Sequence, residues 1–212
     1  MGFIRQFDLP YPQPWEYVHK MLGDLRGGFF VDVGAYDGTL VTNTYFFEDV
    51  LGWDGLCIEP NPRAFESLSA TRKTKCINCG VSDVNGEMEF IKVNGYAEML
   101  SGFREYLAED HIDRINQEVE KHNDSVENIM VKSRRLDDIL RENNINKIDY
   151  LSIDTEGNEF RVLQSINFDE CYIRIISAEN GDDKSGVRQF LLEKGFSFVA
   201  SVCGDHIYIN TK

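Results

Sequence analysis

Positive charge is scarce in this chain, and a long apolar run is absent. The 212 residues include 22 Lys and Arg against 36 Asp and Glu, which gives a formal net charge of −14. A negative field of this kind repels nucleic acid and anionic membrane surfaces, so neither is expected as the main partner. The local basic group Lys132, Arg134 and Arg135 could still bind an anion. No apolar stretch approaches the length of a membrane span.

Disulfide-forming and secretory features are also missing. The five cysteines are an odd number and Cys57 lies inside an apolar run, so reduced thiols are expected rather than a disulfide framework. Cys76 and Cys79 have a spacing found in zinc sites, but no second pair of Cys or His completes a four-ligand set. The first ten residues contain charged residues and a proline where a signal peptide needs an unbroken apolar region. The sequence therefore predicts a cytoplasmic protein.

The alternation of apolar and amphipathic segments indicates the fold. A chain of 212 residues is long enough for one buried core and short for two, so a single domain over 1–212 is expected. Strands that alternate with helices predict a doubly wound, mainly parallel α/β sheet. The expected strands are 29–33, 55–59, 75–78, 87–93, 129–134, 148–154, 173–179, 196–202 and 206–210, and the expected helices are 40–51, 63–71, 136–141, 160–165 and 184–194.

Three further segments complete this expectation. The turn Gly204-Asp205 is too short for a parallel crossover, so the last strand should run antiparallel to its neighbour. Residues 1–28 contain apolar side chains at helical spacing and predict an N-terminal helical segment. Residues 95–128 are highly charged with apolar residues at helix-like intervals, which predicts a helical cap over the ligand-binding end of the sheet. An ordinary surface helix would explain the same pattern.

An acid and a glycine turn follow the first expected strand. Gly34 and Gly38 can adopt positive φ and let a ligand approach the backbone N–H groups, while Glu59 ends the next strand 21 residues after Gly38. That spacing is typical of a ribose-binding acid. The loop lacks G-x-G-x-x-G and suits a cofactor without pyrophosphate, such as S-adenosylmethionine, whose ammonium group Asp32 would hold while backbone N–H groups bind the carboxylate. A tight turn without a ligand is the alternative.

A second acidic group, Asp154 and Glu156, follows the strand 148–154. In open α/β sheets the carboxyl ends of the strands form the ligand-binding edge. A carboxylate there can accept the proton of a hydroxyl or amine as it attacks a methyl carbon. Asp154 could also cap the next helix, although two acids within three residues exceed what a cap requires. With Glu179 they offer hard oxygen ligands for a divalent cation, but ion pairing explains them too, and no metal ligand is assigned.

Several ordered motifs resemble the FkbM family of S-adenosylmethionine-dependent methyltransferases. They are FFVDVGAYDGTLVTNTYFFE (29–48), GLCIEPNP (55–62), GVSD (80–83), MLSGF (99–103) and IDYLSIDTEGNEF (148–160). The resemblance implies a Rossmann-like class I methyltransferase fold with a seven-stranded sheet, an antiparallel C-terminal strand and a helical insert. It implies that the cofactor is bound by Asp32, Gly34, Ala35, Gly38, Asn43, Glu59, Pro60, Ser82, Asp83 and Asp154, and that Asp154, Glu156 and Glu179 lie at the reaction centre.

The resemblance also implies O-methylation of a hydroxyl on a sugar, glycan or small natural product, although N-methylating relatives are known. Asn180 stands where many relatives have His and cannot serve as a base, which leaves the carboxylates. One alternative is an oxidoreductase that binds a nicotinamide dinucleotide through Glu59, but it needs phosphate-binding turns that this loop lacks. Another is a non-catalytic binding module, which would have no need for all four acids Asp32, Glu59, Asp154 and Glu156.

Overall fold

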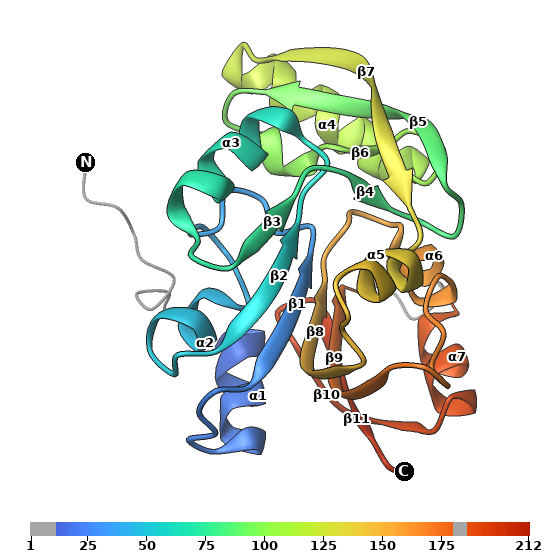
Figure 1. Ribbon diagram of the computed structural model, residues 1–212. Coiled ribbons are helices and arrows are strands. Elements are labelled where there is room, and N and C mark those ends of the chain that lie inside the picture. The colour runs from blue at the N-terminus through green and yellow to red at the C-terminus, as the bar shows by residue number, and fades with distance from the viewer. Residues whose placement is uncertain (1–11, 180–185) are drawn as a thin grey trace.

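The computed structural model describes residues 12–179 and 186–212, in which a seven-stranded sheet forms the centre (Figure 1). In spatial order its strands are β10 (Phe196–Val202), β11 (Asp205–Asn210), β9 (Tyr172–Glu179), β8 (Lys147–Ile153), β1 (Phe29–Val33), β2 (Asp54–Ile58) and β3 (Lys75–Ile77). β11 runs antiparallel to both of its neighbours, and the remaining pairs are parallel. The predicted mainly parallel sheet with an antiparallel C-terminal strand is therefore confirmed.

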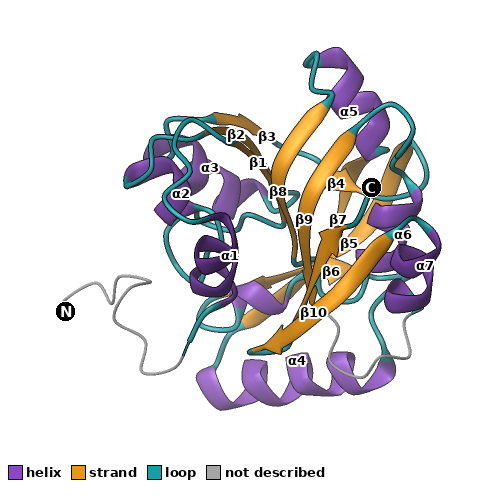
Figure 2. Ribbon diagram, turned by 90° about the horizontal axis from the view of Figure 1, so that it is seen from below, coloured by secondary structure: helices purple, strands orange, loops and turns teal. Residues whose placement is uncertain are grey.

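Helices cover both faces of this sheet (Figure 2). One face carries α1 (Pro14–Leu22), α2 (Tyr45–Asp49) and α3 (Pro62–Thr71), and the other carries α5 (Leu136–Glu142), α6 (Glu159–Gln164) and α7 (Val187–Glu193). The residues of β1 alternate between the two layers, because successive side chains of a strand point to opposite faces. Val31 and Val33 pack with α5 to α7, whereas Phe30 packs with α1 to α3. Asp32 therefore points toward the layer formed by α1, α2 and α3.

Local signals explain where several helices begin. Pro14 and Pro62 occupy the first turns of α1 and α3, where a missing N–H costs nothing. The Asn61 side chain caps α3 by accepting a hydrogen bond from the Arg63 amide at 3.1 Å. The expected helix over 40–51 is wrong in extent, because only Tyr45–Asp49 is helical. Ahead of α2 the Thr42 and Thr44 hydroxyls bond to Asp32 instead.

A second, four-stranded sheet was not predicted. Its order is β4 (Gly80–Val81), β7 (Ser125–Arg134), β5 (Gly86–Asn94) and β6 (Gly102–Phe103), and β5 pairs antiparallel with β7 and with β6. The helix α4 (Glu109–His122) packs on this sheet through Ile115, beside the short 3₁₀ helix η2 (Glu98–Leu100). The expected helical insert 95–128 contains η2 and α4, but the segment also supplies β6 and the first part of β7.

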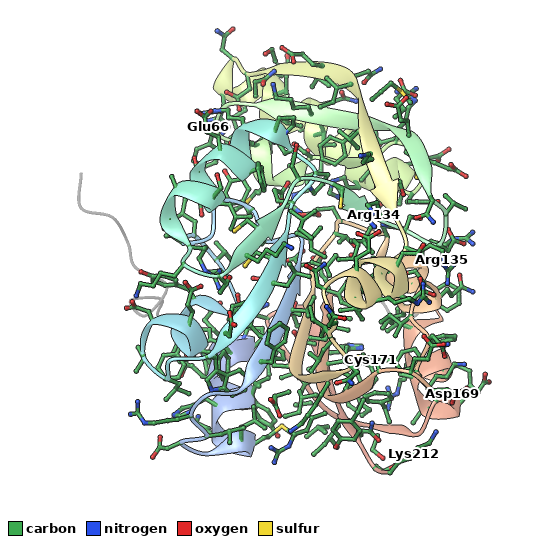
Figure 3. All side chains as sticks on the ribbon, in the orientation of Figure 1. Glu66, Arg134, Arg135, Asp169, Cys171 and Lys212 are labelled. Carbon is green, nitrogen blue, oxygen red and sulfur yellow. The ribbon has the colours of Figure 1, made fainter. Side chains whose placement is uncertain are left out.

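The basic group at the end of β7 is largely neutralised. Arg134 pairs with Glu142 of α5, and Arg135 pairs with Asp137 at 2.9 Å; Figure 3 labels both arginines where β7 meets α5. An anion at this position would have to compete with those carboxylates.

Within the described ranges, no helix has the length and apolar character needed to cross a membrane.

Candidate functional site

The carboxyl ends of three adjacent strands meet at one cavity of about 570 Å³. β8, β1 and β2 are neighbours in the sheet, and Asp154, Asp32 and Glu59 at or just beyond their ends all line this cavity. A volume of this size lies within the usual range for small-molecule sites. The three acids are far apart in sequence, and the parallel register brings them together as the sequence predicted.

Most of the residues singled out from the sequence line this cavity, but three do not. The lining residues include Asp32, Gly34, Ala35, Asn43, Glu59, Pro60, Asp154, Glu156 and Glu179. Gly38 faces α3 instead, because a Cβ there would lie 2.8 Å from both Leu68 and Arg72. Ser82 is fully buried and donates to Asp83 at 3.1 Å, and Asp83 pairs with Arg161 at 3.0 Å. Asn180 lies outside the described residues.

The glycine loop uses its first amides internally. The N–H groups of Gly34 and Ala35 both donate to the Ile58 carbonyl, at 2.9 and 3.1 Å. These two amides therefore join β1 to β2, and other N–H groups of the loop would have to bind a ligand carboxylate. Farther along the loop the amides of Val41 and Thr42 make no hydrogen bond within the described part of the chain, and both residues line the cavity.

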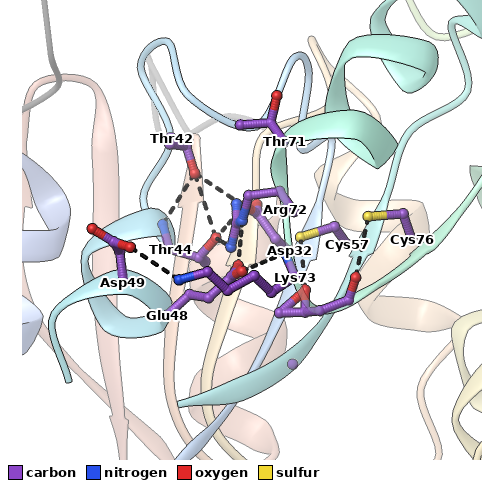
Figure 4. A network of polar contacts seen from close by, with 12 residues as sticks. Asp32, Thr42, Thr44, Glu48, Asp49, Cys57, Thr71, Arg72, Lys73 and Cys76 are labelled. Atoms are coloured by element: carbon purple, nitrogen blue, oxygen red, sulfur yellow. Dashed lines mark hydrogen bonds and ion pairs between the residues drawn. The ribbon is translucent and has the colours of Figure 1, made fainter. Parts of the chain in front are cut away.

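Asp32 is held through one of its two oxygens (Figure 4). Its Oδ2 accepts hydrogen bonds from the hydroxyls of Thr44 at 2.6 Å and Thr42 at 3.3 Å, and lies 4.0 Å from Nη1 of Arg72. Burial raises the pKa of Asp32, and the positive charge of Arg72 opposes that shift. The carboxylate is thus fixed in place while it borders the cavity.

Glu59 is buried and holds the chain on both sides of it. Its Oε2 accepts from the Tyr36 amide at 2.9 Å, and its Oε1 accepts from the Asn61 amide at 2.8 Å. Burial raises the pKa of Glu59 to about 7, and these two backbone hydrogen bonds oppose the shift. Each carboxylate oxygen has a second lone pair, so both can accept a further hydrogen bond from a ligand.

Three further carboxyl groups gather at the ends of β8 and β9. Asp154, Glu156 and Glu179 each place an oxygen within 4.8 Å of the others. Burial, followed by the charge of Glu179, raises the pKa of Asp154 well above its ordinary value and that of Glu156 to about 8. The same two causes raise the pKa of Asp205 on β11 to about 7. The cavity therefore holds several carboxyl groups that exchange protons near neutral pH.

α4 contributes two residues that the sequence analysis missed. Arg114 lines the cavity, and Nδ1 of His111 lies 3.5 Å from Oε2 of Glu156. Nε2 of His111 is 2.9 Å from the Leu100 carbonyl oxygen, which fixes the ring. The one sequence signal was the spacing of His111 and Arg114, three residues apart and so on one helix face. Without the second sheet, nothing in the sequence placed that face against the acids.

Backbone strain is concentrated around the same cavity. Among the described residues, six non-glycine residues have positive φ, and four of them line the cavity: Tyr36 at 48°, Val41 at 51°, Glu156 at 57° and Cys203 at 52°. For β-branched Val41 this conformation is a marked outlier. Such strain persists only where the surrounding structure imposes it, and it clusters at functional sites. The geometry thus supports a ligand site independently of the charges.

Comparisons with known proteins agree with this architecture. The profile of the methyltransferase FkbM domain matches residues 32–198. The methyltransferase FkbM of Methylobacillus flagellatus KT has a similar structure, with a TM-score of 0.52 and 14% identity over 94% of this chain and 48% of that one. The chain thus spans about half the length of that protein.

Two human structures show the same fold at lower identity. The human methyltransferase 10 domain containing protein has a TM-score of 0.50 and 12% identity, over 93% of this chain and 80% of that one. The N-terminal domain of human METTL16, solved in complex with SAH, has a TM-score of 0.50 and 11% identity, over 93% and 68%. Curated protein sequences give no match.

Proposed function

The chain belongs to the methyltransferase FkbM family, and from that membership we propose that it is an S-adenosylmethionine-dependent methyltransferase acting on a hydroxyl group of a sugar, glycan or small natural product. One observation carries the proposal. Asp32, Glu59 and Asp154, from three neighbouring strand ends, border a single cavity of about 570 Å³. An acidic rim suits a cationic cofactor that also bears a ribose diol, because carboxylates accept hydrogen bonds from both its ammonium group and its hydroxyls. These three acids therefore fit S-adenosylmethionine.

Different residues of the cavity contact different groups of the cofactor. Glu59 accepts hydrogen bonds from the ribose hydroxyls, and the free oxygen of Asp32 accepts from the ammonium group. The amides of Val41 and Thr42, which make no hydrogen bond within the described residues, bind the carboxylate. The resemblance implies that Ser82 and Asp83 border the adenine, but neither lines the cavity, so Gly80 and Val81 of β4, which do line it, are assigned that contact.

The bound cofactor supplies an electrophilic methyl group on a sulfonium. Asp154, Glu156 and Glu179 orient the acceptor and receive the proton that leaves its hydroxyl. Glu156 suits this role because a pKa of about 8 leaves it able both to bind and to release a proton near neutral pH. His111 stands 3.5 Å behind it and restrains the carboxylate. The close spacing of these three carboxylates also suits a divalent cation. Chelation with EDTA distinguishes cation binding from direct proton acceptance by the carboxylates.

A specific feature disfavours the dinucleotide alternative. The amides of Gly34 and Ala35 donate to the Ile58 carbonyl and are not directed at a ligand. A pyrophosphate-binding turn needs such amides free. The methyl-donor interpretation does not require them.

The proposal is tested by methyl transfer. The purified chain is incubated with methyl-labelled S-adenosylmethionine and a panel of sugars, glycans and hydroxylated metabolites, with and without EDTA. Label recovered in a methyl ether of the acceptor supports the proposal. Loss of methyl transfer in the presence of EDTA assigns a divalent cation to Asp154, Glu156 and Glu179. Label on nitrogen would correct the acceptor class. Failure to bind S-adenosylhomocysteine in calorimetry would overturn the proposal as a whole.

A further inference from the structure

Arg72, the residue that follows α3, is a buried cation beside the cavity rather than in it. Its side chain has no exposed surface. Nε donates to the carboxylate of Glu48, and Nη2 donates to the Thr44 hydroxyl at 3.0 Å. The rings of Phe30 and Tyr45 lie 5.2 and 5.6 Å from the guanidinium carbon. Because burying an arginine is costly unless it is paired, this placement calls for a reason beyond filling space.

A chain of contacts leads from Arg72 to Asp32 (Figure 4). The Thr44 hydroxyl accepts from Arg72 and donates to Oδ2 of Asp32 at 2.6 Å. Thr42 and Nη1 of Arg72 also approach Oδ2. Across residues 12–179 and 186–212, Oδ1 of Asp32 accepts no hydrogen bond, and Asp32 borders the cavity. The network thus occupies one oxygen and leaves the other for a ligand.

Apart from Arg72, the titratable groups that interact with Asp32 carry no positive charge. The titratable groups that interact with it, apart from Arg72, are Glu59, Cys57, Cys76, Tyr150 and Asp205. They are carboxyl groups, thiols and a phenol, none of which can become positively charged, so none offsets the cost of a buried carboxylate. Of the basic side chains in the described ranges, Arg72 is the one that forms an ion pair with Asp32. Glu48 in turn holds the guanidinium and accepts from the Lys73 amide at 2.6 Å.

We propose that Arg72 is a positioning residue for the cofactor, which keeps Asp32 ionised and directs its second oxygen toward the ammonium group of the amino-acid part. This inference rests on the proposed function and extends it to a residue outside the cavity lining. A purely structural role, in which Arg72 only joins α2 to α3, is the competing explanation. The two differ in which ligands they affect. Positioning concerns only ligands with an ammonium group, whereas a structural fault weakens every ligand of the cavity.

Two probes separate these explanations. S-adenosylhomocysteine carries the ammonium group, and 5′-methylthioadenosine has the same nucleoside without the amino-acid part. Arg72→Met should weaken binding of the first by about ten- to a hundredfold and leave the second nearly unchanged. Thr44→Val, which keeps the side-chain shape, should weaken S-adenosylhomocysteine by about three- to tenfold. Arg134→Met, at an arginine paired outside the cavity (Figure 3), should change neither.

The Asp32→Asn background supplies the decisive comparison. Once the carboxylate is gone, Arg72→Met or Thr44→Val should cause no further loss of S-adenosylhomocysteine affinity. In the Arg72→Met protein, raising the pH should restore part of the affinity because Asp32 then ionises. Glu59 titrates near pH 7 and would affect both ligands, since both contain the ribose. The ratio of the S-adenosylhomocysteine affinity to the 5′-methylthioadenosine affinity at each pH therefore removes its effect.

Each outcome bears on a defined claim. If Arg72→Met does not fold, Thr44→Val carries the test alone. Equal weakening of both ligands, or a full additional loss in the Asp32→Asn background, overturns the positioning role and leaves the proposed function intact. A wild-type protein that binds neither ligand overturns the proposed function and this inference with it.

Discussion

Gly34 and Asp154 meet where β1 and β8 end, so closely that a Cβ on Gly34 would lie 1.7 Å from the backbone oxygen of Asp154. The Asp154 amide also donates to the Val33 carbonyl at 3.0 Å. The glycine is therefore required by the approach of two strands. The same approach places the carboxylates of Asp32 and Asp154 at one cavity.

Gly34→Ala should lower the free energy of unfolding by about 3 kcal/mol or more, because the methyl group meets a backbone atom at a φ of 84°. Gly52→Ala is a matched control. Gly52 also has positive φ, at 67°, but a Cβ there has nothing within 4 Å, so only about 1–2 kcal/mol should be lost. Urea denaturation of both variants measures the difference, and equal losses would refute the steric account.

Glu59→Gln should weaken S-adenosylhomocysteine binding by about 1–3 kcal/mol, the usual scale for charge-assisted hydrogen bonds. The amide cannot accept from both the Tyr36 and Asn61 amides and still accept from a ribose diol. Glu89→Gln, at an exposed pair with Arg104, is the control and should leave affinity unchanged. Calorimetry with unchanged affinity for Glu59→Gln would remove the ribose role.

Asp154→Asn should reduce kcat by about a hundredfold or more while the dissociation constant of S-adenosylhomocysteine changes far less. The substitution keeps the shape and removes a proton acceptor at the centre of the acidic group. Glu156→Gln should have a similar effect, with a changed pH profile. Steady-state kinetics together with calorimetry separates turnover from binding. Wild-type turnover in both variants would exclude these carboxylates from proton transfer.

The ligand-free protein should become less stable as pH rises from 6 to 8. The pKa values of Glu59 and Asp205 are raised to about 7 and that of Glu156 to about 8, so the folded protein binds more protons than the unfolded chain in this range. The free energy of unfolding then falls with increasing pH, by about 5 kcal/mol in total for three groups that titrate independently. Urea denaturation at the two pH values measures the change. Glu156→Gln should reduce it, and greater stability at pH 8 would contradict the assignment.

The central sheet was predictable because its signals are local. β1 is apolar except for Asp32, and the turn between β10 and β11 is short, and each of these features determines its own local geometry. The second sheet could not be derived this way. β4 and β6 have two residues each, and β5 pairs with β7 across the segment that contains α4. The helix expected over 40–51 was shortened by Asp32, whose bonds to Thr42 and Thr44 are tertiary contacts with no local trace.

The site residues likewise separate into those with local sequence signals and those placed by long-range contacts. Asp32, Glu59 and Asp154 were predictable, because parallel strands deliver their carboxyl ends to one edge. His111 and Arg114 were not, since α4 reaches the acids only through the second sheet. Gly38 shows the limit of motif reasoning, because its freedom at positive φ serves contact with α3 and not the cavity.

The most direct test of the account is a crystal structure of the chain with S-adenosylhomocysteine. The account predicts the ribose hydroxyls within hydrogen-bond distance of Glu59 and the ammonium group on Oδ1 of Asp32, with Asp154 facing the sulfur. A ligand bound elsewhere, or one in this cavity whose ribose and ammonium groups contact neither acid, would contradict it.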